Sequence, residues 1–432
     1  MQPDNRLYQY FAKKWLRKYL PSATLPAHTL DCPECGSRIA LPKLRQGQKA
    51  ICSVCGHHLV HIEPEPYVTV LACALAALIL MVVVYSLPFV NVEMTGMFSP
   101  LTLSGMFHAL LVDSWGFLAA VLLTFVFGLP LLFLLLAIYV YAYFLFKQEF
   151  SPTLRNSMRL LLRVQQWMMV DVFFISMLVA YIKIQSVAAV NFGVAFWLMP
   201  FLVILILRTS VAISPHWLYS KIQHADQIPF FQAGEETVCC SRCLHFRPKN
   251  EVFCRVCDSE LFHRRPGSLK MSFLLLLAAM ILYVPANLLP IMISENPLNK
   301  EISTIMSGII FMWNDGDKLI ASIIFSASIA VPTLKILSML WLLFSARFKP
   351  LLSIKALSLQ YRITEAIGRW SMIDIFVIII MMTTFHSKVA RVTPGPAAIY
   401  FCLVVVLTML SAHFFDVRLL WDKTVHKFVE TD

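Results

Sequence analysis

Eight cysteines form two groups whose spacing suits a tetrahedral metal ion. The first group is Cys32, Cys35, Cys52 and Cys55, and the second is Cys240, Cys243, Cys254 and Cys257. Two Cys-x2-Cys pairs can surround one ion with four thiolates, which is a common ligand set of structural zinc sites. Because four thiolates leave no open coordination position, the pattern predicts two structural zinc ions and no catalytic metal.

The two cysteine groups leave three points open. Iron is the alternative metal, because a tetrahedron of four sulfurs suits both ions. Cys239 directly precedes Cys240, so either thiol could be the ligand, and His57, His58 and His61 could replace a thiolate of the first group. Redox-active or disulfide-bonded cysteines are a further interpretation, which a reducing compartment disfavours.

A second set of polar side chains lies within or beside strongly apolar segments. A charge at the centre of a bilayer costs about 2.5–3.5 kcal/mol, so Lys335 and Asp374 each require a reason. Their depths, about 15 Å and about 10 Å from the same side at 1.5 Å per helical residue, are compatible with an ion pair. Ser328 shares a helix face with Lys335, and Ser371 shares one with Asp374. Thr393 lies at the beginning of the last apolar segment.

Two interpretations fit these five residues. They could form a polar track that relays protons or admits a lipid headgroup, or Lys335 and Asp374 could form a salt bridge that only packs two helices. Asp171 matches Asp374 in the first half of the chain, whereas the positions that match Lys335, at 131–137, are apolar. The sequence therefore predicts that the chemistry resides in the second half.

The composition indicates which elements must carry these residues. The 432 residues are 58% hydrophobic and only 14% charged, against about 25% charged in an average soluble domain. This composition excludes an ordinary soluble enzyme and a disordered chain. The sequence contains no phosphate-binding glycine loop and no nucleophile elbow, so we expect no ATP hydrolysis and no enzymatic activity of this chain.

Eight apolar segments are long enough to predict transmembrane helices. They lie near 67–90, 115–147, 160–184, 190–210, 269–293, 317–345, 367–387 and 396–414. The second and sixth contain Pro130 and Pro332, and a neighbouring helix can satisfy the carbonyl that each proline frees.

Lysine and arginine are distributed very unevenly between these segments. One side carries 26 of them, in 1–66, 147–163, 220–270 and 346–369, against 3 on the other side, in 91–114, 294–317 and 387–395. Cytoplasmic loops are enriched in these residues, so both termini and the central segment are predicted to be cytoplasmic. Residues 1–66 contain no apolar segment, so we expect no signal peptide.

The chain is an internal repeat. The segment WMMVDVF at 167–173 matches WSMIDIF at 370–376, and Pro130 matches Pro332. Because each half has an even number of predicted spans, the halves share one orientation. The predicted fold is an all-α polytopic membrane protein, with eight transmembrane helices as two parallel four-helix repeats, each preceded by a small cytoplasmic four-cysteine zinc ribbon. The predicted domains are a cytoplasmic segment at 1–66 with a ribbon at about 30–60, a four-helix domain at 67–215, a segment at 216–266 with a ribbon at about 237–262, a four-helix domain at 267–415, and a cytoplasmic tail at 416–432.

The sequence resembles the paraquat-inducible protein A / LetA family over nearly its whole length. The motifs that carry the resemblance are CPEC at 32–35 with CSVC at 52–55, PANLLP at 285–290, VPTLK at 331–335 and GRWSMID at 368–374. The resemblance implies an inner-membrane protein of Gram-negative bacteria that contributes to envelope integrity. It also implies a homo-oligomeric partner whose MCE domains form a periplasmic tunnel, phospholipid as the cargo, and cytoplasmic zinc ribbons.

The resemblance implies an intramembrane polar network as the functional site. Its residues are Ser328, Lys335, Ser371, Asp374 and Thr393. The leading hypothesis is phospholipid transport between the inner and outer membranes. Proton movement through this network is the candidate energy source for that transport. The alternatives are a membrane anchor that only holds the tunnel, and a membrane redox protein with four-cysteine iron sites. No nucleic-acid partner is expected.

Overall fold

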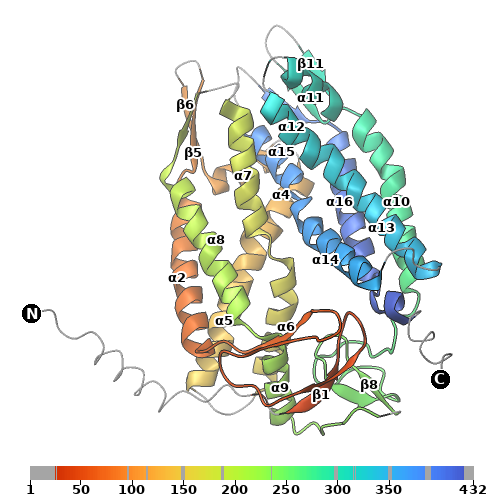
Figure 1. Ribbon diagram of the computed structural model, residues 1–432. Helices are drawn as coiled ribbons and strands as arrows, with labels where there is room; N and C mark the ends of the chain where they lie inside the picture. The colour runs from red at the N-terminus through yellow and green to blue at the C-terminus, as the bar shows by residue number, and fades with distance from the viewer. Residues whose placement is uncertain are drawn as a thin grey trace, which may run out of the picture. The chain divides into compact units, whose positions relative to one another are not determined.

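The computed structural model describes most of the chain. The described residues are 25, 27–94, 97–112, 115–146, 151–185, 189–234, 236–295, 300–314, 316, 318–348, 353–384 and 391–422. The beginning of the predicted cytoplasmic segment and residues 423–432 of the predicted tail lie outside this range. Figure 1 shows that helices dominate the fold and that the strands form small, separate sheets.

The chain divides into two compact units. Unit 1 comprises 1–78, 131–166 and 204–263, and unit 2 comprises 79–130, 167–203 and 264–432. Three of the boundaries fall within the helices α2 (Pro66–Ser86), α5 (Leu129–Phe146) and α8 (Val194–Ala212). The predicted domain limits, 67–215 and 267–415, follow the sequence repeat instead and remain a prediction.

Unit 1 combines three two-stranded antiparallel sheets with helices. Besides its parts of α2, α5 and α8, it contains β1 (His28–Asp31), β2 (Arg38–Leu41), β3 (Lys49–Ile51), β4 (His58–His61), α6 (Pro152–Val164), α9 (Pro215–Ala225), β8 (Thr237–Cys239) and β9 (Phe246–Pro248). The sheets pair β1 with β2, β3 with β4, and β8 with β9. Each of these hairpins is too small to bury an apolar face alone, so a metal ion is a suitable substitute for a core.

Unit 2 contains the remaining helices and two three-stranded antiparallel sheets. Its first elements are β5 (Val90–Met94), β6 (Met97–Leu101), α3 (Leu103–Val112), α4 (Gly116–Leu122), η1 (Leu123–Gly128), α7 (Val170–Gln185) and β7 (Ala189–Phe192), and η2 (Gln165–Trp167) crosses its boundary. The later ones are α10 (Ser268–Leu288), β10 (Met292–Glu295), β11 (Lys300–Ser303), α11 (Ile305–Asn314), α12 (Lys318–Phe325), η3 (Ser326–Ala330), α13 (Val331–Arg347), α14 (Ile354–Trp370), α15 (Ile373–Thr384), β12 (Arg391–Pro394) and α16 (Ala397–Phe414). The sheets have the orders β6-β5-β7 and β11-β10-β12.

One glycine closes each three-stranded sheet. A Cβ on Gly193 would lie 2.1 Å from the Pro88 carbonyl oxygen, and a Cβ on Gly395 would lie 2.0 Å from that of Pro290. Only glycine permits so close an approach of two backbones. Because each glycine directly follows the last strand of its sheet, it holds the following helix, α8 or α16, beside the sheet.

Seven helical stretches of the described chain are long and apolar enough to cross a membrane. They are 66–86, 116–146, 152–181, 194–212, 268–288, 328–347 and 397–414. The seventh predicted span, 367–387, contains a turn at Ser371 and Met372, after which α15 has only 12 residues. A multi-pass membrane protein is thus supported, while the count of eight spans stays a prediction.

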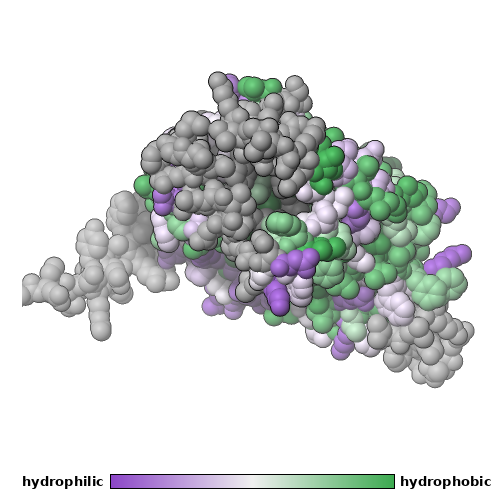
Figure 2. All heavy atoms as spheres, turned by 90° about the horizontal axis from the view of Figure 1, so that it is seen from above, coloured by the Kyte–Doolittle hydropathy of each residue, from purple (hydrophilic) through white to green (hydrophobic). Residues whose placement is uncertain are grey.

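Large apolar side chains point away from the interior along these helices. Ile79, Val82 and Ile281 are 67%, 63% and 64% exposed. Figure 2 shows apolar residues, in green, over much of the described surface visible from above. An outer surface of this kind fits hydrocarbon, because a soluble protein rarely exposes such large continuous apolar areas.

The helical stretches that contain Pro130 and Pro332 are both locally wound as π-helix. The π-turn η1 ends two residues before Pro130, and η3 ends two residues before Pro332. Proline lacks an N–H and frees the carbonyl four residues before it. The Tyr85 hydroxyl donates a 2.7 Å hydrogen bond to the Val126 carbonyl that Pro130 frees, so a neighbouring helix does satisfy it as expected.

Candidate functional site

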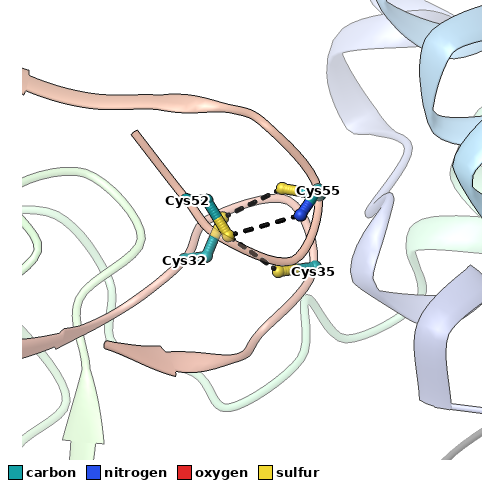
Figure 3. A group of neighbouring side chains, drawn as sticks. All are labelled: Cys32, Cys35, Cys52 and Cys55. Atoms are coloured by element: carbon teal, nitrogen blue, oxygen red, sulfur yellow. Dashed lines mark hydrogen bonds between the residues drawn. The ribbon is translucent and has the colours of Figure 1, made fainter. Parts of the chain in front are cut away.

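The first four cysteines converge on one point. Figure 3 shows Cys32, Cys35, Cys52 and Cys55 facing one another from two turns of unit 1. Their sulfur atoms all lie within 4.8 Å of one another, and the Cys32–Cys55 and Cys35–Cys52 sulfur pairs are both 3.6 Å apart. A tetrahedral ion with sulfur ligands at about 2.3 Å requires sulfur pairs about 3.8 Å apart, so the donor set fits zinc.

The second group has the same geometry. Cys240 and Cys257 have their sulfur atoms 3.5 Å apart, as do Cys243 and Cys254, and all four are buried. Cys240 is therefore the cluster member, whereas the Cys239 sulfur lies 3.9 Å from the Cys240 carbonyl. Burial raises the pKa of the Cys243 thiol well above its usual value, so an ion bound there must displace its proton.

One turn is repeated four times around the two clusters. The residue after each second cysteine has positive φ and donates its N–H to the carbonyl of the first cysteine of the pair. In the first cluster this residue is Gly36 or Gly56, and in the second it is Leu244 or Asp258. The Cys-x2-Cys spacing thus gives a rigid turn that aims both sulfur atoms at the ion.

The histidines that follow the first cluster do not join its four sulfur atoms. The His57 Nδ1 lies 2.7 Å from Glu34, and the His61 Nε2 lies 3.5 Å from Glu63. Cys32, Cys35, Cys52 and Cys55 complete a four-ligand set without them.

Three other histidines, which sequence reasoning did not single out, surround the second cluster. His28 of β1, His216 of α9 and His245 near β9 form a stack with ring centroids 5.0 Å and 4.9 Å apart. The Nδ1 atoms of His216 and His245 donate to the Cys243 carbonyl at 2.9 Å and 2.8 Å. Burial lowers the pKa of both rings, to about 4 for His245, so both are neutral.

The tautomers of the stack follow from these hydrogen bonds. Because a carbonyl only accepts, the neutral His216 carries its proton on Nδ1 and accepts at Nε2. The Nε2 of His28 lies 2.9 Å from that atom and is the donor. The carbonyl of Cys243 is thereby bonded to α9 and to the second ribbon, and His216 links it to His28 of β1.

A helix also holds the second ribbon. Arg159 of α6 donates to the carbonyls of Arg255 and Val256 at 2.8 Å and 3.1 Å. These carbonyls lie between the last two ligands of the cluster, so the ribbon is fixed to α6 at the metal turn. Such contacts favour a docking or structural role for the ribbons.

The second candidate site is centred on Lys335 in unit 2. This side chain is 3% exposed, and within the described chain its Nζ has no hydrogen-bond partner. A Cβ on Gly368 of α14 would lie 3.4 Å from the Nζ, so glycine leaves room there for the ammonium group. A buried cation without a described partner in an apolar helix marks a functional site.

Hydroxyl and amide groups line both sides of Lys335 along α13. Thr333 bonds the Tyr283 hydroxyl of α10 at 2.8 Å. Ser338 bonds Thr364 at 2.7 Å and accepts from Gln360 at 2.8 Å, both on α14. Sequence reasoning did not assign any of these five side chains to the network. Thr333 and Ser338 lie within three residues of Lys335, so their positions in the sequence could have indicated a shared polar environment.

The other four predicted residues of the polar network lie in four different elements. Ser328 is buried within η3, and Ser371 is buried at the turn between α14 and α15. Asp374 is the second residue of α15, and its side chain lies outside the described residues, so its ion pair with Lys335 stays a prediction. Thr393 lies in β12, where its hydroxyl donates to the Ile293 carbonyl at 3.4 Å.

The two aspartate-bearing helices pack together. Asp171 lies in the first turn of α7, and α7 contacts α15 through Phe173 and Phe376, whose ring centroids are 5.6 Å apart. Both aspartates follow a break in the preceding helix, at Met168–Met169 and at Ser371–Met372. The helices that carry the two aspartates are therefore neighbours, one from each half of the repeat.

Comparisons with known proteins give sequence matches over most of the chain. A family model described as Paraquat-inducible protein A matches residues 68–223 and 269–424. The chain is 32% identical over 402 residues to "Intermembrane transport protein PqiA" of Escherichia coli K12, covering 91% of this chain and 95% of that one. It is 31% identical over 394 residues to "Lipophilic envelope-spanning tunnel protein A" of the same organism, covering 90% of each chain.

A relative from another organism is similar over the same extent. The "Probable intermembrane transport protein" of Haemophilus influenzae is 28% identical over 408 residues, covering 92% of this chain and 96% of that one. No solved structure matches the chain.

Proposed function

This chain belongs to the paraquat-inducible protein A family, and on that premise we propose that it transports phospholipid between the inner and outer membranes. It would load or receive lipid at the periplasmic side of the inner membrane for a homo-oligomeric tunnel of MCE domains. Relatives named for intermembrane transport and for an envelope-spanning tunnel, each matched over at least 90% of this chain, support the proposal.

The proposed arrangement in the membrane follows the charge distribution and the order of elements. Eight spans form two parallel repeats, with both termini and both zinc ribbons in the cytoplasm. The asymmetry of 26 lysines and arginines against 3 supports this orientation. The twofold match of the family model, at 68–223 and 269–424, supports the repeat.

The burial of Lys335 is the single observation that carries a coupled mechanism. An ammonium group that is 3% exposed within an apolar helix is costly to retain unless a moving proton or an anionic headgroup uses it. We place Lys335 and Asp374 at the centre of the network and Ser328, Ser371 and Thr393 along its path. Proton movement through this network would drive lipid transfer.

A transfer assay tests this proposal. Labelled phospholipid would move from proteoliposomes that contain the chain and its MCE partner to acceptor vesicles, with and without a proton gradient. We expect Asp374→Asn to abolish gradient-dependent transfer, because the amide cannot exchange a proton with Lys335. Asp171→Asn is the matched control, since it changes the repeat-related carboxylate on α7 and should retain most transfer.

The opposite result would assign a different role. Transfer that is independent of the gradient and equal in Asp374→Asn and the wild-type protein would leave a passive conduit or a membrane anchor for the tunnel. The buried Lys335 would then serve helix packing.

A further inference from the structure

A long apolar groove lies between α10 and α13 in unit 2. Its volume is about 1150 Å³, which exceeds the range of about 300–1,000 Å³ of most small-molecule pockets. Its walls include Phe273 of α10 and Leu337, Leu340 and Phe344 of α13. It lies at the end where α10 begins and α13 ends (Figure 1), and it is separate from the Lys335 site, because none of the residues of that site lines it.

Three cations stand at one end of this groove. Arg265, Lys270 and Arg347 line it, and within the described chain none of their side chains forms an ion pair. The Arg265 guanidinium donates to the His413 carbonyl at 3.0 Å and lies over the Phe414 ring, contacts that leave its positive charge without a counter-ion. The neighbouring carboxylates are already paired, since Asp422 binds Arg264 and Asp416 binds Arg418. The groove therefore presents positive charge that no side chain of the described residues neutralises.

Two further features lie beside the same groove. The Trp341 side chain lines it, and its indole N–H is buried without a partner in the described residues. A small displacement that uncovers this N–H would let it donate to an ester oxygen of a bound lipid, which would supply the partner that buried indole groups usually have. The first turn of α10, from Ser268, also lines the groove, and a helix N-terminus attracts phosphate.

The donors are ordered along the groove as the parts of a phospholipid are. Trp341 precedes Arg347 by six residues, which places it about 9 Å further along the helix axis. The cations thus match a phosphate, the indole matches an ester oxygen, and the apolar walls beyond match acyl chains. Basic pockets between helices at a cytoplasmic membrane surface bind anionic lipid headgroups in this manner.

We propose that the groove between α10 and α13 binds one anionic phospholipid of the surrounding leaflet, with its phosphate at Arg265, Lys270 and Arg347 and its acyl chains along Phe273, Leu340 and Phe344. The proposal requires that α10 and α13 cross a bilayer. It does not require that the chain transports lipid, so a bound lipid and a transported one are tested separately.

Native mass spectrometry of the delipidated full chain tests the proposal. The protein would be titrated with equal amounts of phosphatidylglycerol and phosphatidylcholine. We expect one phosphatidylglycerol per chain, preferred at least tenfold. In the double variant Lys270→Gln with Arg347→Gln, each substitution should reduce the preference for phosphatidylglycerol about fivefold. Lys355→Gln, which removes an exposed cation of α14 outside the groove, should retain it.

A second variant keeps the test decisive if the charge variant fails to fold. Leu340→Trp fills the groove and should remove both lipids. Equal retention of the two lipids by the wild-type protein, or an unchanged preference in the double variant, would overturn the proposal. Displacement of the lipid by millimolar glycerol phosphate would indicate a site for soluble phosphates, and a dimer that Leu340→Trp dissociates would indicate a protein interface. Either result would also overturn it.

Discussion

At the scale of single residues, the buried side chain of Lys335 is energetically costly. Its Nζ lies against Gly368 and has no hydrogen-bond partner within the described residues. An isolated buried charge destabilises a fold, whereas an apolar residue of similar volume in its place is often neutral or stabilising. The stability of the fold therefore does not explain why a lysine occupies this position.

The first prediction separates these two properties of Lys335. We expect Lys335→Met to abolish gradient-driven lipid transfer while the thermal unfolding midpoint stays equal or rises, because methionine fills the space without a charge. Unfolding in detergent and the transfer assay would be measured together, with Lys355→Met as the surface control. A midpoint several degrees lower would instead assign Lys335 to a packing salt bridge.

Asp416 gives a prediction on pH. Burial opposes ionisation of this carboxyl, but hydrogen bonds and charge from Arg418 outweigh it and lower its pKa below 3.8. A lowered pKa in the folded state stabilises above the pKa of the unfolded chain, and this stability is lost as the pH falls through the folded value. Removing one partner of a buried pair costs about 3–5 kcal/mol.

We therefore expect Asp416→Asn to lower the unfolding midpoint at pH 7, and we expect the difference from the wild-type protein to shrink below about pH 4. Asp422→Asn is the matched control, since Asp422 also pairs with an arginine, Arg264, but its side chain is 40% exposed. Surface pairs contribute about 0–1 kcal/mol. An equal loss in both variants would show that burial of Asp416 is irrelevant.

At the scale of elements, the ribbons are small modules whose cysteine clusters could each hold a metal ion, which would then supply most of their stability. The hairpins β3–β4 and β8–β9 have strands of only three or four residues. A structural zinc ion contributes about 10–16 kcal/mol of apparent binding free energy, far more than such hairpins gain by packing. The four turns with positive φ set the sulfur positions but supply no core of their own.

Metal analysis gives a prediction at this scale. The wild-type chain should contain two zinc ions and no visible absorbance, and Cys240→Ser should contain one, because its sulfur belongs to the second cluster. Cys239→Ser should retain two, since its neighbour supplies the ligand. Iron with visible absorbance would overturn the zinc assignment and support the redox alternative. A chelator should release the second ribbon from α6, as protease sensitivity of 237–262 would report.

Breaks in helices are the part of the elements that the sequence predicted least well. Continuous apolar runs led to uninterrupted spans at 160–184 and 367–387, but the structure has turns at Met168–Met169 and Ser371–Met372. Hydropathy averages over about 20 residues and does not register a single unwound turn. The repeated tryptophan and aspartate on either side of each turn, in WMMVD and WSMID, are a signal that could have located it.

At the scale of the whole molecule, the sequence predicted composition-driven features and missed packing-driven ones. The membrane class, the two cysteine clusters and the proline-freed carbonyl all follow from local chemistry and are found. The histidine stack joins residues as far apart as 28 and 245, and the contact of α7 with α15 joins the two halves of the repeat. No local pattern carries such information, because it depends on which surfaces meet after folding.

Orientation in the membrane is the prediction at this scale. Asn314→Cys, at the exposed end of α11, should react with a membrane-impermeant maleimide in intact spheroplasts, whereas Asn250→Cys, in the second ribbon, should react only after permeabilisation. The unmodified chain is the background control for its own thiols. Reaction of Asn250→Cys without permeabilisation would reverse the proposed topology.

The π-turns η1 and η3 affect how insertions and deletions act on this chain. A π-turn contains one residue more than an α-turn, and one residue corresponds to about 100° of helical rotation. Deleting one residue within 326–330 would replace the π-turn by an α-turn and would keep the rotational phase of α13 relative to α12, whereas deleting a second residue there would rotate α13 by about 100°. After the second deletion Lys335 would point away from Gly368, although every side chain of the network would still be present. Variants of this chain should therefore tolerate the loss of one residue from η3 more readily than the loss of two.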